Sequence, residues 1–213
     1  MKRQRLWQWL LVMLVAFGAS VVHAQQSPDE VIRTAVDKLV ERIEADREQL
    51  EKDPRYAQKV VDEELDAMVD FRRITRAVMG EHFSQANREQ RNKFLQQFRA
   101  SLVNTYAAGI TLYEGQSYRV LPLADGDVRG NRARVQMEFE TEDGKVLPIA
   151  YTMTLNDEQW KVDNVIVNNL NLGRIFQAQF AQDMAANNND LDAVINNWSA
   201  DLGLDEMSAE TEE

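Results

Sequence analysis

The sequence contains no cysteine, which excludes disulfide bonds, thiol catalysis and cysteine-ligated metal sites. It also has no Gly-x-Ser-x-Gly elbow, no phosphate-binding glycine loop, no dinucleotide fingerprint and no His-Glu-x-x-His pair. Only two histidines occur, His23 and His82, and His82 follows Gly80 at a predicted helix stop, where a solvated or capping histidine is common. The chain therefore lacks the signatures of the familiar hydrolases and nucleotide-dependent enzymes.

Positive charge is also scarce, because 24 Lys and Arg face 35 Asp and Glu, for a net charge of −11. Nucleic acid is a poor partner for such a chain. Anionic membrane surfaces repel it as well, so charge alone does not hold it on a bilayer. We expect a protein that acts in solution.

Residues 1–24 have the pattern of a secretory signal peptide. Lys2, Arg3 and Arg5 form a basic start, a short apolar run follows, and a small-residue site ends at Ala24. We predict export by the Sec route and cleavage after Ala24. The apolar run is too short to serve comfortably as a mature membrane helix.

The rest of the chain is long enough for one domain with a sizeable core. We assign residues 25–203 to a single α+β domain. Residues 204–213 are acidic and lack a hydrophobic pattern, so they are predicted to be a disordered tail.

The first half of the domain has helical periodicity. The predicted helices span residues 27–50, 56–68, 71–79 and 87–112. In the last of them Phe94, Phe98, Leu102, Tyr106 and Ile110 recur every four residues, so one side of this helix is continuously apolar. Such a face needs something to cover it.

From about Tyr118 the period changes to two, which indicates an antiparallel sheet. The predicted strands are residues 118–123, 132–141, 146–155 and 160–168, and helices at 172–185 and 191–202 follow. The layout is a curved, antiparallel four-stranded sheet covered by helices, with a cone-shaped interior. Periodicity does not decide whether side chains fill that interior.

Two sets of polar residues leave alternatives open. Asp163 with Tyr151 or Tyr106 could supply an acid–base pair in an apolar pocket, although a strand-end or turn partner is the commoner role for such an aspartate. Arg129, Arg132 and Arg134 form a basic hairpin that either protects a strand edge or contacts a phosphate or a partner.

Several segments together resemble the MlaC family of periplasmic phospholipid-binding, or toluene tolerance, proteins. They are Asp70-Phe71-Arg72-Arg73-Ile74 with Gly80, Thr105-Tyr106-Ala107, the hairpin from Gly144 to Tyr151, Trp160-Lys161-Val162-Asp163, and Asn171-Leu172. The resemblance implies a nuclear-transport-factor-2-like (NTF2-like) cone enclosing an apolar cavity. It further implies no catalysis and no cofactor, with phospholipid as cargo.

The resemblance also implies where such a carrier works. Members of the family move phospholipid across the periplasm between an outer-membrane lipoprotein–porin complex and an inner-membrane ABC transporter that bears an MCE-domain protein. This transport keeps the outer membrane asymmetric. We expect the same location and partners here. A pocket enzyme of the isomerase type and a periplasmic chaperone stay as alternatives.

On this hypothesis the acyl chains lie between one face of the sheet and the apolar helical faces. The predicted lining residues are Phe71, Ile74, Phe94, Phe98, Leu102, Tyr106, Val135, Met137, Phe139, Ile149, Tyr151 and Met153. Arg72, Arg73, Arg129 and Arg132 are the candidates for contact with a headgroup or a partner, because guanidinium groups suit phosphate. Asp70 lies next to Phe71 and could instead pair with one of these arginines.

Overall fold

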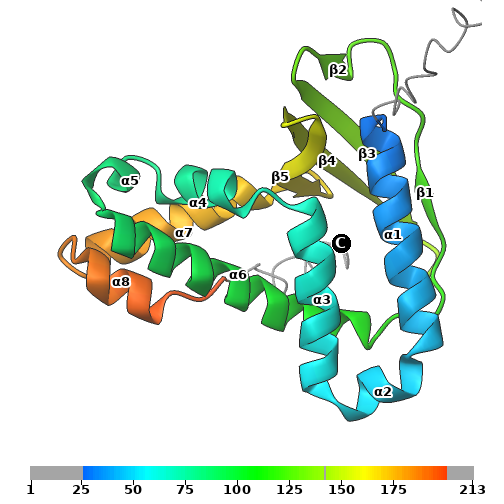
Figure 1. The fold of residues 1–213 in the computed structure, drawn as a ribbon, viewed down its shortest axis with the longest axis horizontal. Helices are drawn as coiled ribbons and strands as arrows, with labels where there is room; N and C mark the ends of the chain where they lie inside the picture. Colours follow the sequence, from blue (N-terminus) through cyan, green and yellow to red (C-terminus); the bar gives the residue numbers. More distant parts are fainter. Residues whose placement is uncertain (1–25, 142, 201–213) are drawn as a thin grey trace, which may run out of the picture.

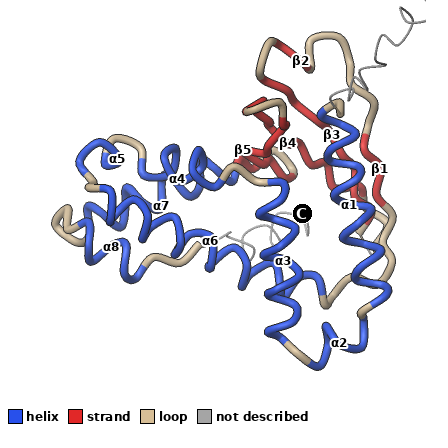
Figure 2. The backbone as a smooth tube through the Cα atoms, in the orientation of Figure 1, coloured by secondary structure: helices blue, strands red, loops and turns tan. Residues whose placement is uncertain are grey.

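The computed structural model describes residues 26–141 and 143–200, in which helices precede and follow an antiparallel sheet (Figures 1 and 2). The helices are α1 (Pro28–Ala45), α2 (Arg47–Lys52), α3 (Pro54–Met68), α4 (Phe71–Met79), α5 (His82–Gln85), α6 (Arg88–Ile110), α7 (Leu172–Ala186) and α8 (Leu191–Asn197). The strands are β1 (Tyr118–Val120), β2 (Val128–Arg129), β3 (Arg132–Glu140), β4 (Val146–Asn156), β5 (Gln159–Val167) and β6 (Leu170–Asn171). The predicted signal peptide and acidic tail lie outside the described residues.

The sheet confirms the predicted antiparallel arrangement but not the predicted number of strands. Its order is β1-β3-β4-β5-β6, with β2 paired to β3, so six strands replace the four expected. The additional strands, β2 and β6, have two residues each, which is too short to leave an alternating pattern in the sequence. Asn168 and Asn169, with φ of 47° and 66°, form the tight turn from β5 to β6, since asparagine tolerates the left-handed conformation.

The helix boundaries follow from capping residues. Ser27 and Glu30 form a capping box, and Pro28 occupies the first turn of α1. The helix predicted at 27–50 is divided at Asp46, and α2 follows this break. The helix predicted at 191–202 ends earlier than expected, because Trp198 is extended, with ψ of 133°.

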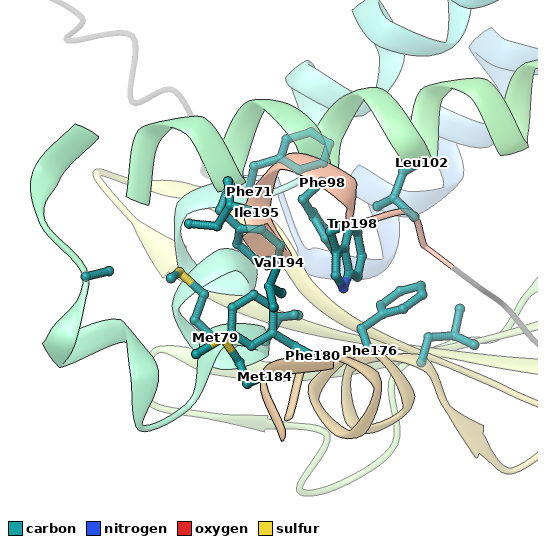
Figure 3. Packing of buried hydrophobic residues seen from close by; sticks show 14 residues of the cluster. Phe71, Met79, Phe98, Leu102, Phe176, Phe180, Met184, Val194, Ile195 and Trp198 are labelled. Carbon is teal, nitrogen blue, oxygen red and sulfur yellow. The ribbon is translucent and has the colours of Figure 1, made fainter. Parts of the chain in front are cut away.

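The apolar face of α6 has two different neighbours along its length. Its first half packs into an aromatic cluster between α6, α7 and α8, shown in Figure 3. There the Phe94 ring centroid lies 4.8 Å from that of Phe180 and 5.2 Å from that of Trp198. The second half of α6 extends past this cluster toward α3 (Figure 1).

A separate core holds α1 against the sheet. Ile32 of α1 and Val135 and Met153 of the sheet are fully buried in it. The sheet is joined to α4 at its other side, because the Asp70 N–H donates to the Val162 carbonyl at 2.8 Å. Helices α4, α5, α7 and α8 with the first half of α6 thus form one arm of the molecule, and α1 to α3 with the sheet and the second half of α6 form the other (Figure 1).

Candidate functional site: an apolar cavity between the sheet and the helices

A cavity of about 290 Å³ lies where the two arms meet. Its walls come from α1, α3, α4, α6 and α7 on the helical side and from β4 and β5 of the sheet. The lining residues are Ala35, Val36, Leu39, Val61, Glu64, Leu65, Met68, Val69, Phe71, Ile74, Phe98, Leu102, Tyr106, Ile110, Ile149, Tyr151, Val162, Asp163, Asn164, Val165, Val167, Leu172, Gly173 and Phe176. Nearly all of them are apolar, so this space suits a hydrocarbon ligand.

The structure brings together seven of the twelve residues predicted to contact acyl chains. These seven are Phe71, Ile74, Phe98, Leu102, Tyr106, Ile149 and Tyr151. The other five lie elsewhere. Phe94 is fully buried in the aromatic cluster, Val135, Met137 and Met153 pack in the core beside α1, and Phe139 is half-buried on β3 opposite Leu147.

Sequence reasoning missed the contributions of α1, α3 and α7 to the cavity wall. Leu39, Leu65 and Phe176 are examples. Their apolar faces were visible in the helical periodicity. However, the same periodicity describes a face that packs against a core and one that borders a cavity, so it does not separate the two.

Two tyrosines from opposite walls border the cavity. Tyr106 of α6 is 37% exposed, and it lines the cavity together with Tyr151 of β4. Although part of the Tyr106 side chain is exposed, desolvation by the apolar surroundings raises the pKa of both hydroxyls, and the proximity of Tyr106 raises that of Tyr151 further. The Tyr151 hydroxyl donates only a weak hydrogen bond, to the Met137 sulfur at 4.0 Å. Both phenols therefore stay neutral and behave as largely apolar wall.

Asp163 lies in the cavity wall at an irregularity of the sheet. Thr152 pairs with Asn164 and Met153 with Val162, so Asp163 is the extra residue of a bulge in β5. Its side chain is only 4% exposed, whereas the sequence suggested a strand-end or turn position.

The Asp163 carboxylate is already engaged by three donors. Its Oδ2 atom lies 2.8 Å from Arg73 Nε and 2.5 Å from Arg132 Nη1, and it accepts a hydrogen bond from Thr154 Oγ1 at 2.6 Å. Its Oδ1 atom is buried and has no partner among the described residues. The two guanidinium groups and the Thr154 hydroxyl occupy Oδ2 and give this carboxylate a structural role, so the geometry does not favour the acid–base alternative.

The four candidate arginines have different environments. Arg73 of α4 and Arg132 of β3 both contact the same oxygen of Asp163. Arg129 donates from Nε to the Gly126 carbonyl at 3.0 Å within the β2 turn. Arg72 is exposed on α4, and the structure shows no ion pair for it among the described residues. They do not form one cluster at the cavity.

Other chemical features of the described residues are few. His82 opens α5, and its ring centroid lies 6.0 Å from that of Phe180. Within residues 26–141 and 143–200, no group of three or more His, Cys, Asp or Glu side chains is placed to hold a metal ion. No helix in this part of the chain has the length and apolar character needed to cross a membrane.

Together, the fold and the site define an α+β protein with an apolar ligand cavity between an antiparallel sheet and several helices. The family model described as MlaC protein matches residues 33–200, and the chain therefore belongs to the MlaC family.

Two curated relatives agree with this assignment, and one solved structure shares the fold. The toluene tolerance protein ttg2D of Pseudomonas putida is 34% identical over 202 residues, which cover 94% of this chain and 93% of the relative. The intermembrane phospholipid transport system binding protein MlaC of Haemophilus influenzae is 27% identical over 120 residues, which cover 54% and 56% of the two chains.

The solved structure is that of a phospholipid-binding protein from Ralstonia solanacearum in complex with a phospholipid. It superposes with a TM-score of 0.72 at 23% identity and covers 88% of this chain and all of the other. At this identity the likeness establishes the fold.

Proposed function

We propose that this protein is a periplasmic phospholipid carrier that holds acyl chains in the cavity between the sheet and the helices. The observation that carries the proposal is the wall itself, in which apolar side chains from five helices and two strands face one space. The membership in the MlaC family supports it. So does the phospholipid bound to the structural relative, because the two proteins share a fold.

A phospholipid carrier needs an apolar cavity because exposing acyl chains to water costs much free energy. Exposing two acyl chains of roughly fifteen methylenes each to water costs about 24 kcal/mol, at ~0.8 kcal/mol per methylene. An apolar cavity offsets this cost for the methylenes that it covers, whereas a shallow groove covers few of them. The phosphate stays at the mouth, because burial of an unpaired charge is costly. Lipid then moves between apolar environments with little net change in free energy, and the carrier itself needs no nucleotide.

We propose the cavity residues as the acyl-chain site, in place of the full predicted set. Phe71 and Phe98 lie edge to face, with ring centroids 6.5 Å apart, and belong both to the aromatic cluster and to the cavity wall. Glu64 also borders the cavity, but its carboxylate is held by Lys38 at 2.9 Å and Arg42 at 3.3 Å. This pairing keeps a charged side chain compatible with an apolar neighbour.

The proposed route follows the family resemblance. Lipid would pass between an outer-membrane lipoprotein–porin complex and an inner-membrane ABC transporter that bears an MCE-domain protein. The proposed signal peptide at residues 1–24 supports a periplasmic location. The name of the Haemophilus relative, a binding protein of an intermembrane phospholipid transport system, supports the route. An NTF2-like cone stays a prediction for the shape of the fold.

The first experiment is to purify the protein without detergent and identify bound small molecules by native and denaturing mass spectrometry. We expect stoichiometric phospholipid. A protein that is empty and also fails to take phospholipid from vesicles would contradict the proposal and favour the enzyme or chaperone alternative.

A pair of variants tests the position of the site. Ile149→Arg puts a charge into the cavity wall, and we expect loss of bound lipid from a folded protein. Val146→Arg makes the same kind of change on the same strand, at a residue that is 60% exposed, and we expect lipid to be retained. Met153→Arg is unsuitable, because Met153 is fully buried outside the cavity and the change would test folding instead.

A further inference from the structure

A groove rich in arginine runs between α4 and α6, next to α5. Arg72, Arg73 and Arg76 of α4 and Arg88 and Arg91 of α6 line it, and Asp70 is the acidic residue among the lining residues. Phe71 and Ile74 of α4 border the lipid cavity instead. Helix α4 therefore separates the two features, with apolar side chains toward the cavity and basic ones toward the groove.

The positive charge in this groove is largely uncompensated. Within the described part of the chain, Arg73 pairs with Asp163, but Arg72, Arg76, Arg88 and Arg91 form no ion pair. The carboxylate of Asp70 is occupied, because it accepts hydrogen bonds from the Arg73 backbone N–H at 3.0 Å and from Asn156 Nδ2 at 2.9 Å. On a chain with 35 acidic and 24 basic side chains, such a concentration of arginine is unexpected.

Phe83 holds two of these arginines in place. The guanidinium carbons of Arg76 and Arg91 lie 4.7 Å and 4.3 Å from its ring centroid. Arg91 also donates from Nε to the Phe83 carbonyl at 3.0 Å, which leaves its two terminal nitrogens for another acceptor. Two cations are thus brought to one ring, and neither forms an ion pair with a described residue, an arrangement that is favourable once an anion is present.

The groove wall also includes the buried hydroxyl of Thr75, which has no partner among the described residues, and some apolar surface. Thr75 is 2% exposed, and no described residue accepts from or donates to its Oγ1 atom. Ala77 and Leu95 add apolar surface beside it. The groove thus combines basic side chains with apolar contact area, as protein interfaces do.

We propose that this groove is a docking site for a carboxylate-rich segment of a partner protein. The inference rests on the proposed function, since a carrier must dock at the complexes that load and unload it. Arg72 and Arg76 are one helical turn apart on α4, and Arg88 and Arg91 are three residues apart on α6. The charges therefore line both walls of the groove, which suits an extended segment with several carboxylates better than one phosphate.

An anionic membrane fits the groove less well. The arginines lie within a concave surface, which a flat bilayer does not enter. The net charge of −11 on the whole chain also repels an anionic bilayer, whereas a narrow acidic segment meets only the local positive charge.

The test measures binding of a synthetic peptide of eight residues in which glutamate and alanine alternate, with both ends blocked. The groove variant carries Arg72→Glu, Arg76→Glu and Arg88→Glu. The control variant carries Arg55→Glu, Arg134→Glu and Arg174→Glu, three exposed arginines elsewhere that give the same change in net charge. Calorimetry at low and at raised salt, on the full chain as purified, provides the affinities.

We expect saturable binding by the unchanged protein that weakens with salt, and binding that is about tenfold weaker or more in the groove variant. The control variant should bind within about threefold of the unchanged protein. Equal losses in the two variants would overturn the proposal, because they would reflect net charge alone. Absence of peptide binding by the unchanged protein would overturn it as well.

Two further probes separate this proposal from its competitors. These probes are inorganic phosphate and phosphatidylglycerol vesicles. If one of them binds the unchanged protein where the peptide does not, and binds the groove variant more weakly, the groove is a site for phosphate or for a membrane instead. Bound phospholipid, measured by mass spectrometry in all three proteins, reports on the carrier function separately. Its absence would contradict the proposed function whatever the peptide result.

Discussion

Arg73 and Asp163 form an ion pair of 2.8 Å between helix α4 and the bulge in strand β5. Arg132 of β3 reaches the same carboxylate oxygen at 2.5 Å. One buried carboxylate therefore joins the helical arm to two strands of the sheet at the cavity wall. This linkage accounts for the placement of α4 beside the cavity, together with the backbone hydrogen bond from Asp70 to Val162.

Replacement of Asp163 by asparagine should destabilise the protein by about 1–3 kcal/mol. The change removes the charge that pairs Arg73 and Arg132. Both arginines are more than 40% exposed, at 48% and 42%, so they can turn to water, and this limits the loss. Urea unfolding should show a lower midpoint with an unchanged slope.

The matched control for this change is Asp66→Asn. Asp66 is 63% exposed and pairs with Arg99, which also holds Asp62. We expect a loss below about 1 kcal/mol there, since exposed ion pairs contribute little. Similar midpoints for the two variants would show that the Asp163 linkage has no special role in stability.

The sequence predicted which residues share one face of a helix or strand better than it predicted which element packs against that face. Alternation in β3 and β4 correctly placed Val135, Met137, Ile149, Tyr151 and Met153 on one face of the sheet, because directly paired residues share a face. Which part of that face borders the cavity depends on where α1 packs. That placement is a long-range contact, and the period of a strand contains no information about it.

The same limit applies to α6 and to Asp163. A repeat of four residues identified the apolar side of α6, but not the point at which α7 and α8 cease to cover it. The position of Asp163 depends on a shift of register between β4 and β5. A one-residue bulge leaves the alternating pattern of short strands almost unchanged, so a single sequence does not reveal it.

Gly173 permits a close approach between α7 and β5. Its N–H donates to Asn164 Oδ1 at 3.1 Å, and a Cβ atom at this position would lie 2.5 Å from the same oxygen. We expect Gly173→Ala to lower the free energy of unfolding by about 1–3 kcal/mol, because the side chain of Asn164 must move and lose its bond.

Gly109→Ala in α6 provides a control, for which we expect a change in the free energy of unfolding of opposite sign. A Cβ atom built there has no neighbour within 4 Å. Gly109→Ala should therefore raise stability by about 0.5–1 kcal/mol, through the better helix propensity of alanine. Thermal and urea unfolding of the two variants provide the comparison. A neutral effect at Gly173 would mean that Asn164 can rearrange without loss.

Tyr151→Phe should leave stability within about 1 kcal/mol of the unchanged protein and should leave bound lipid unaltered. The hydroxyl makes only its 4.0 Å contact with the Met137 sulfur, so its removal breaks no strong hydrogen bond. Unfolding curves and lipid analysis by mass spectrometry test both points. Loss of lipid with stability unchanged would assign the hydroxyl a direct role in holding cargo, contrary to its proposed role as apolar wall.

Stability should decline in alkaline solution, because the folded state favours neutral tyrosine side chains. Burial and the hydrogen bond from its hydroxyl to Asp37 raise the pKa of Tyr118 to about 12, and the pKa values of Tyr56, Tyr106, Tyr113 and Tyr151 are also raised. Their stabilising contribution is complete below the unfolded pKa, near 10.0, and is lost as pH rises through the folded values.

The tyrosine effect can be measured in two ways. Phenolate absorbance of the folded protein should rise at higher pH than that of the protein in denaturant, and the urea midpoint should fall between pH 10.0 and about pH 12. Tyr118→Phe removes one of these groups, so the decline over this interval should be shallower. A urea midpoint that stays constant or rises over the same pH interval would contradict this prediction, because the phenols would then titrate alike in the folded and unfolded states.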